Sequence, residues 1–216
     1  MTAYKNFVRD LPERCSDLFN TLEETTRFID KDVTFLIAIA STGINIPLER
    51  LKEPTGENTP HPSRDWERYN QAKCQLAEIF EKYFLGSELW SNQPSSWCCG
   101  NIKSVEKPLD DWPELIKPTP IRSDKTIGTI LKHLRNALAH GNIYTRGSDE
   151  KIKEIIFLTE VKQYSNKFKY LSVSPRDFRI FLKKWFDFIK SLELPTEHNV
   201  DSSDDYDVDL KDGTNA

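Results

Sequence analysis

Arg135, Asn136 and His140 are the residues whose types and spacing could support chemistry. The imidazole of a histidine is the side chain most often used as a general acid or base, so His140 suits that role. The guanidinium of Arg135 is permanently charged and presents a fork of donors, which suits a crowded, negatively charged phosphate. The amide of Asn136 can hold either the imidazole or the phosphate by hydrogen bonding. Together these residue types could move a proton and bind an anionic group.

The three residues lie at the end of the clearest predicted helix, Ser123–His140. Ser123 or Asp124 can cap this helix, and Gly141 stands where a helix-ending glycine belongs. At about 100° per residue, one apolar stripe faces a core: Ile127, Leu131, Leu134 and Leu138. A second stripe lies almost opposite, on an expected exposed face: Thr129, His133, Asn136 and His140. Arg135 points about 140° away from His140 around the axis.

The rest of the chain is predicted to be mainly helical. Apolar periodicity indicates one or two helices over residues 4–29, a buried helix over 33–40 that ends near Gly43, and a helix over 65–85 that ends at Gly86. Residues 53–64 are a polar loop, and residues 86–122 form a long irregular insertion in which tryptophans serve as packing anchors. Segments 152–161 and 168–173 predict a β-hairpin, and Ser174-Pro175 opens a last helix. The expected fold is all-α: a helical bundle with one small β-hairpin.

Composition and charge define the class of protein and its domain organisation. The chain has 216 residues, with 12 Phe, 7 Tyr and 5 Trp, enough for one buried core over residues 1–194. Residues 195–216 are expected to be an acidic, disordered tail, since six Asp and one Lys fall in the last 16 residues. The first 200 residues hold 28 acidic and 29 basic side chains, with a basic stretch at 162–190. Such a surface permits a polyanionic partner.

Several features of the sequence point to a cytoplasmic protein without a cofactor. No apolar run of 18 residues and no secretory signal is present, so no membrane span is expected. The four cysteines lack the spacing of a metal site and are expected to be reduced thiols. No metal or other cofactor is therefore predicted.

The segment Arg135-Asn136-Ala137-Leu138-Ala139-His140-Gly141 resembles the signature of HEPN domains, an Arg with a polar follower and a His after four to six positions. The upstream segment DVTFLIAIASTGINIPLER and the hairpin followed by a basic helix are also similar to HEPN proteins. The resemblance covers roughly residues 1–192. It implies a HEPN-like bundle and a metal-independent endoribonuclease, acting as a homodimer whose two motif helices face one another.

The resemblance also implies roles and partners. Arg135, Asn136 and His140 would be catalytic, and His133, Lys132 and Tyr144 are candidate substrate-binding residues. RNA is the implied substrate, in antiviral defence or in a toxin–antitoxin system with an antitoxin or another defence protein as partner. A Tyr two residues after the His, seen where a nucleotidyltransferase controls the protein, is replaced here by Asn142.

Two other readings of the same residues remain open at this point. One is a catalytically inactive HEPN-type module that binds RNA, a nucleotide or a protein. The other is an interaction protein whose motif helix only builds a dimer. Individual residues also have simpler explanations: His140 suits a helix C-terminus by its charge, and His133 and Lys132 could simply face solvent. The acidic tail could be only a solubilising segment.

Overall fold

The computed structural model describes residues 7–23, 32–51, 70–87, 96–102, 119–121, 124–148, 151–161 and 167–193. The predicted loop at 53–64 and the predicted acidic tail at 195–216 lie outside these residues. So do Trp90 and Trp112 of the predicted irregular insertion.

Five helices occur in the described residues: α1 (Phe7–Glu23), α2 (Asp32–Leu51), α3 (Asn70–Glu81), α5 (Ile127–His140) and α6 (Pro175–Ser191). The predicted opening of the last helix is confirmed, because the Ser174 hydroxyl accepts a hydrogen bond from the Asp177 amide and Pro175 occupies the first turn. The predicted end of the second helix is wrong. Helix α2 continues through Gly43 and Pro47 to Leu51.

The described residues contain four strands, which form one antiparallel sheet in the order β1-β4-β3-β2. They are β1 (Cys98–Ile102), β2 (Ile143–Ser148), β3 (Lys151–Glu160) and β4 (Phe168–Val173). Strands β3 and β4 are the hairpin predicted from sequence. Strand β1 adds to one edge of this hairpin, where Gly100 pairs with Tyr170, and β2 adds to the other, where Tyr144 pairs with Ile156.

The expectation of an all-α bundle with one small hairpin is therefore wrong, since the fold combines helices with a four-stranded antiparallel sheet. Strand β1 lies inside the segment predicted to be irregular, and its five residues have no alternating apolar pattern of their own. A segment this short becomes a strand because the open edge of β4 supplies hydrogen-bonding partners. Strand β2 begins two residues after Gly141 and pairs back along β3.

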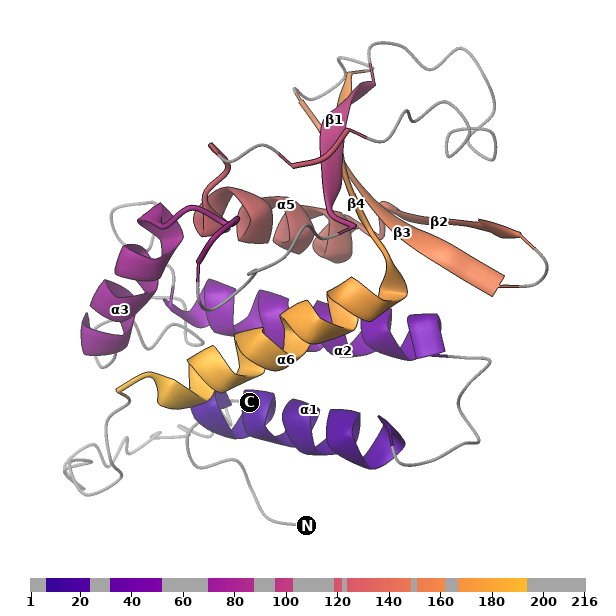
Figure 1. Ribbon diagram of the computed structural model, residues 1–216. Helices are drawn as coiled ribbons and strands as arrows, with labels where there is room; N and C mark the ends of the chain where they lie inside the picture. Colours follow the sequence, from indigo (N-terminus) through magenta and orange to yellow (C-terminus); the bar gives the residue numbers. More distant parts are fainter. Residues whose placement is uncertain are drawn as a thin grey trace, which may run out of the picture.

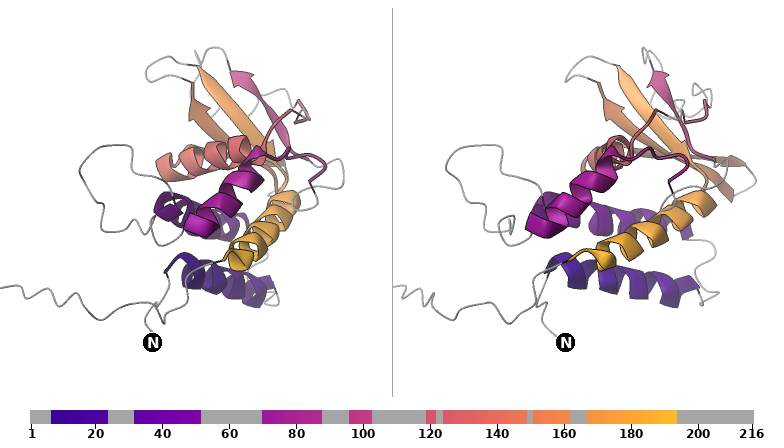
Figure 2. Two further views of the ribbon diagram at one scale, coloured as in Figure 1. Left: turned by 90° about the vertical axis from the view of Figure 1, so that its left-hand side faces the viewer. Right: turned by 60° about the vertical axis from the view of Figure 1, so that its left-hand side comes forward.

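The helices lie on one face of the sheet (Figure 1). Helix α5 packs against β3 and β4, and α6 also contacts β3. Helix α2 contacts both α5 and α6, α1 covers α2 and α6, and α3 packs against α5 (Figure 2). Helix α5 therefore packs between the sheet and the helices α2 and α3, and the predicted catalytic residues lie on it.

The buried core explains why α2 can continue past a glycine. The indole N–H of the fully buried Trp185 on α6 donates to the carbonyl oxygen of Gly43 at 2.7 Å. A Cβ at Gly43 would overlap the ring of Phe186, so only glycine permits this approach of the two helices. Trp97 is also buried and makes an edge-on contact with Phe181, at 5.3 Å between ring centroids. The predicted role of Trp97 as a packing anchor is confirmed.

None of the helices in the described ranges combines the length and the apolar character needed to cross a membrane. The four cysteines all lie in described residues, and none forms a disulfide.

Candidate functional site

Helix α5 has well-defined ends, and these fix the position of the predicted site. The Thr126 hydroxyl caps the start by accepting a hydrogen bond from the Thr129 amide at 3.2 Å. Thr126 thus takes the role predicted for Ser123 or Asp124. Gly141 adopts a left-handed conformation with φ of 67°, and the Asn142 amide bonds back to the Ala137 carbonyl at 3.0 Å. This ending places His140 in the last turn.

The face of α5 opposite its buried stripe is exposed only in part, because His133 on this face packs against β3. Lys132, Ala139 and His140 are exposed there, while Arg135 and Asn136 are partly buried. The core stripe is buried as predicted, with Ile127, Leu131 and Leu134 fully enclosed. The site residues are therefore held on a helix whose other side is anchored in the core. Substitutions on the exposed part of this face can alter chemistry without opening the core.

Arg135 is held from two sides. Its guanidinium donates to the Oδ1 atom of Asn136 at 2.8 Å and forms an ion pair with Glu49 near the end of α2. The side chains of Arg135 and Glu49 keep 30% and 41% of their exposure, so water reaches this pair. The Asn136 amide therefore helps to hold the guanidinium of Arg135 in place. Glu49 is a site residue that sequence reasoning missed, because no local pattern links α2 to a residue 86 positions away.

His140 and Arg135 do not face each other within one chain. Five residues of α-helix separate them by about 7.5 Å along the axis and about 140° around it. Arg135 turns towards α2 and Glu49, whereas His140 is exposed at the helix end. A single phosphate in contact with both residues would therefore need a second copy of the chain to supply one of them.

His133 occupies a different environment from the one its helical position predicts. Its Nε2–H donates to the Phe157 carbonyl at 2.9 Å, and the Thr159 hydroxyl donates to Nδ1 at 3.2 Å. Burial lowers the pKa of His133 below its ordinary value near 6.5, and Lys169 adds to this effect. A neutral His133 therefore ties α5 to β3. It does not lie free on the exposed face beside His140.

Tyr144 also lies apart from Arg135 and His140. It belongs to β2 and packs against the cluster of Ile156, Leu158 and Tyr170. Neighbouring residues of β3, such as Phe157, point to the other face of the sheet and join the core that α5 covers. The structure thus brings Arg135, Asn136 and Lys132 together and places Tyr144 on the far face of the sheet.

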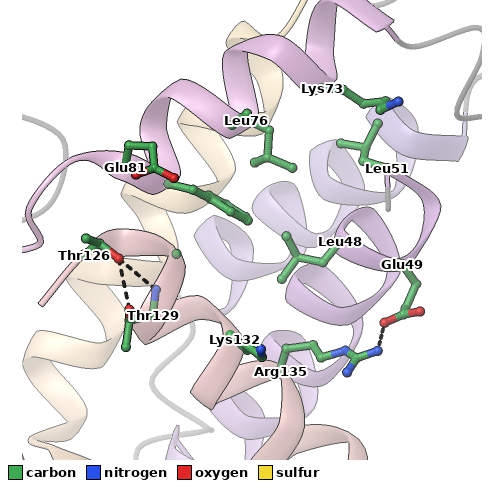
Figure 3. Close-up of a pocket in the computed structure, with 13 residues that line it drawn as sticks. Leu48, Glu49, Leu51, Lys73, Leu76, Glu81, Thr126, Thr129, Lys132 and Arg135 are labelled. Carbon is green, nitrogen blue, oxygen red and sulfur yellow. Dashed lines mark hydrogen bonds and ion pairs between the residues drawn. The ribbon is translucent and has the colours of Figure 1, made fainter. Parts of the chain in front are cut away.

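A cavity of about 700 Å³ opens beside Arg135, between α2, α3 and α5 (Figure 3). Its lining is apolar in the middle and charged at the rim: Leu48, Glu49, Leu51, Lys73, Leu76, Ala77, Phe80, Glu81, Thr126, Gly128, Thr129, Lys132 and Arg135. Thr126, Thr129, Lys132 and Arg135 follow one another along the wall that α5 forms. The cavity thus adjoins Arg135, a predicted catalytic residue. No sequence pattern had indicated that a cavity lies there.

The described residues contain no group of three or more His, Cys, Asp or Glu side chains that could hold a metal ion. Within those residues, the chemistry available on α5 is that of an imidazole and a guanidinium.

The family described as HEPN pEK499 p136 matches residues 1–195. The chain therefore belongs to this HEPN family, as its motif residues indicated. Neither the curated proteins nor the solved structures include a match to this chain. A HEPN-type domain is often a ribonuclease or a nucleotide-binding module, which defines the classes of activity to consider.

Proposed function

We propose that this HEPN protein is a metal-independent endoribonuclease, and that its site is assembled from two copies of the chain. The observation that carries the proposal is the placement of His140 and of the Arg135–Asn136 pair on α5, a helix whose apolar side is anchored in the core. Membership of the HEPN family supports RNA as the proposed substrate class. The acid–base group and the phosphate-binding cation are the two groups that cleavage without a metal requires.

The chemical step uses the ribose 2′-hydroxyl as the nucleophile. His140 takes the proton of this hydroxyl while the 2′-oxygen forms a bond to phosphorus, and the bond from phosphorus to the 5′-oxygen breaks. The 5′-oxygen leaves with a proton from the second copy's imidazole or from water. The products are a 2′,3′-cyclic phosphate and a 5′-hydroxyl. Arg135 stabilises the extra negative charge that develops on the phosphate oxygens.

The composite site follows from the separation of about 140° between Arg135 and His140 on one helix. If two α5 helices face each other, the Arg135 of one chain can meet the His140 of the other. Ala139 lies exposed between these residues and has a small side chain, so it does not obstruct a close approach of the two helices.

The catalytic roles are tested by His140→Ala and Arg135→Ala, each compared with Arg176→Ala, which removes an exposed cation from α6. Each α5 variant should lower the cleavage rate of single-stranded RNA by about 100-fold or more, since a general base or a charge-stabilising group is lost. Arg176→Ala should cleave like the wild type. Cleavage should continue in EDTA and leave cyclic phosphate ends. Loss of activity on chelation, or unchanged activity of His140→Ala, contradicts the proposal.

The composite arrangement is tested by mixing the two inactive variants. After random exchange in a 1:1 mixture, about half of the dimers contain one chain of each kind, and one of their two sites is intact. The mixture should therefore regain about a quarter of the wild-type activity. A fully active monomer, or a mixture that regains nothing although the subunits exchange, contradicts the shared site.

One observation favours a second candidate function, a HEPN module that binds RNA without cleaving it. Arg135 is already neutralised by Glu49, as expected of a residue whose role is to hold α2 against α5. The cleavage assay separates the two candidates, because this module binds RNA and leaves it intact.

We also propose a role in antiviral defence or in a toxin–antitoxin system, on the basis of the family resemblance. Expression of the wild-type protein should then arrest bacterial growth, unless an antitoxin or another partner holds it inactive. The His140→Ala variant should not arrest growth. Equal growth arrest by both proteins would separate any toxicity from RNA cleavage.

A further inference from the structure

We propose that the cavity between α2, α3 and α5 binds one unstacked base of single-stranded RNA, next to the phosphate that Arg135 contacts. This inference rests on the proposed function and specifies how the same site would hold its substrate. It assigns a binding role to Phe80 and Ala77, which lie on α3, outside the motif helix.

The size and the shape of the cavity suit such a ligand. Its volume of about 700 Å³ lies within the range of small-molecule pockets. Leu51 and Leu76 form buried parts of its wall, and the ring of Phe80 is partly buried beside them. An open apolar cavity with an aromatic side chain gains stability when a flat, apolar surface fills it. The faces of a nucleobase provide such a surface.

The polar groups of the cavity are arranged along its length as the parts of a nucleotide require. The hydroxyls of Thr126 and Thr129 are hydrogen-bonded to each other at 3.0 Å, and this pair has one further O–H to donate to the edge of a base (Figure 3). Lys132 and Arg135, the cations suited to a phosphate, follow on the next turns of the same helix. Thr126 and Arg135 are nine residues apart on one helix, which is about 13.5 Å.

The same arrangement selects a single strand over a duplex. In an A-form helix the bases are stacked and their faces are not available to a protein, whereas bases of a single strand can turn outward into a pocket. An entering base would bring its own phosphate towards Lys132 and Arg135. The cavity would then choose the position along the RNA at which the phosphate meets the predicted catalytic residues.

The experiment measures binding of two labelled oligonucleotides to full-length protein that carries His140→Ala, so that the RNA stays intact. One oligonucleotide is a single-stranded RNA hexamer, and the other has the same ribose-phosphate backbone without bases. Three substitutions on α3 are compared. Phe80→Leu keeps apolar bulk but removes the ring, and Ala77→Leu fills the cavity from an exposed position. Glu78→Leu places the same side chain on the neighbouring exposed residue, which does not line the cavity.

The parent protein should bind the RNA hexamer about tenfold more tightly than the abasic strand, in keeping with one stacked base. Phe80→Leu and Ala77→Leu should each remove most of this difference and leave abasic binding unchanged, whereas Glu78→Leu should preserve it. Equal discrimination by all three variants overturns the base pocket, even if the wild type cleaves RNA. A change of oligomeric state in place of base discrimination also overturns it, because the cavity would then be a contact between copies. Base-dependent binding by a protein that cleaves nothing supports the pocket and contradicts only the proposed catalysis.

Discussion

Glu49 should compete with RNA for the guanidinium of Arg135, and removing its charge should strengthen RNA binding. The Glu49→Gln variant retains an oxygen that can accept a hydrogen bond from Arg135 but loses the negative charge. Glu49→Ala loses both. The two variants therefore separate the electrostatic effect of Glu49 from its effect on the position of Arg135.

The size of the effect follows from the exposure of the pair. Because both side chains are about a third exposed, water screens their attraction, and the pair contributes about 0.2 to 1 kcal/mol. A phosphate that takes over Arg135 must first replace this interaction. Glu49→Gln should therefore bind RNA about 1.4- to 5-fold more tightly than the parent protein. The free energy of unfolding should fall by no more than about 1 kcal/mol.

The assay is fluorescence anisotropy with a single-stranded RNA hexamer in the His140→Ala background, at about 0.05 M and 0.5 M salt. The gain in affinity should shrink at the higher concentration, since salt screens exposed charges. Glu78→Gln is the matched control, because it removes an exposed carboxylate from outside the cavity and should change affinity less. In protein with His140 intact, Glu49→Gln should leave the single-turnover cleavage rate near that of the wild type, and Glu49→Ala should lower it.

Two results would refute this reasoning. If Glu49→Gln binds RNA no more tightly than Glu78→Gln at low salt, Glu49 does not compete with the phosphate. If Glu49→Gln slows the cleavage step as strongly as Arg135→Ala does, the negative charge of Glu49 is itself required for catalysis.

Three further predictions concern stability and the tail. Gly43→Ala should lower the free energy of unfolding by about 1 to 2 kcal/mol in a denaturant titration. The overlap of the new methyl group with Phe186 destabilises the fold by more than the better helix propensity of alanine stabilises it. A more stable variant would contradict this packing. His133→Gln should flatten the loss of stability on acidification from about pH 7 to pH 5. The pKa of His133 is lowered in the fold. Its contribution to stability is therefore complete above about pH 6.5 and is lost as the pH falls towards the folded-state pKa. If the difference in Tm between the wild type and the variant stays the same across this range, the role of His133 is contradicted. Truncation after Leu194 should leave RNA binding and cleavage unchanged at low salt, and tighter binding by the truncated chain would show that the acidic tail competes with RNA.

The parts of the fold that depend on neighbouring residues could be predicted from the sequence. Helix α5 ends at Gly141 as predicted, because a left-handed turn after the last helical residue favours glycine. The apolar stripe of α5 is buried because a period of 3.6 residues places its members on one side. The hairpin of β3 and β4 and the start of α6 at Ser174 likewise follow from local residue preferences.

The helix start and the outer strands of the sheet depended on distant partners. The backbone of Thr126 pairs with that of Tyr83, which favours Thr126 as the cap over Ser123 or Asp124. Strand β1 has no strong pattern of its own and needs the open edge of β4. Helix α2 continues past Gly43 because α6 packs closely against it, and a local preference for ending a helix at glycine is weaker than that packing.

The candidate site divides in the same way. The presence of Arg135, Asn136 and His140 near the end of one helix, and their angular separation, followed from sequence alone, since helical geometry is the same in every protein. The ion pair with Glu49, the cavity beside Arg135 and the anchoring of His133 to Phe157 came only from the tertiary structure. Each of these depends on which element packs against α5. A helical pattern in the sequence does not specify which elements pack against the helix. Only the packing of α2, α3 and β3 decides which side chains contact α5.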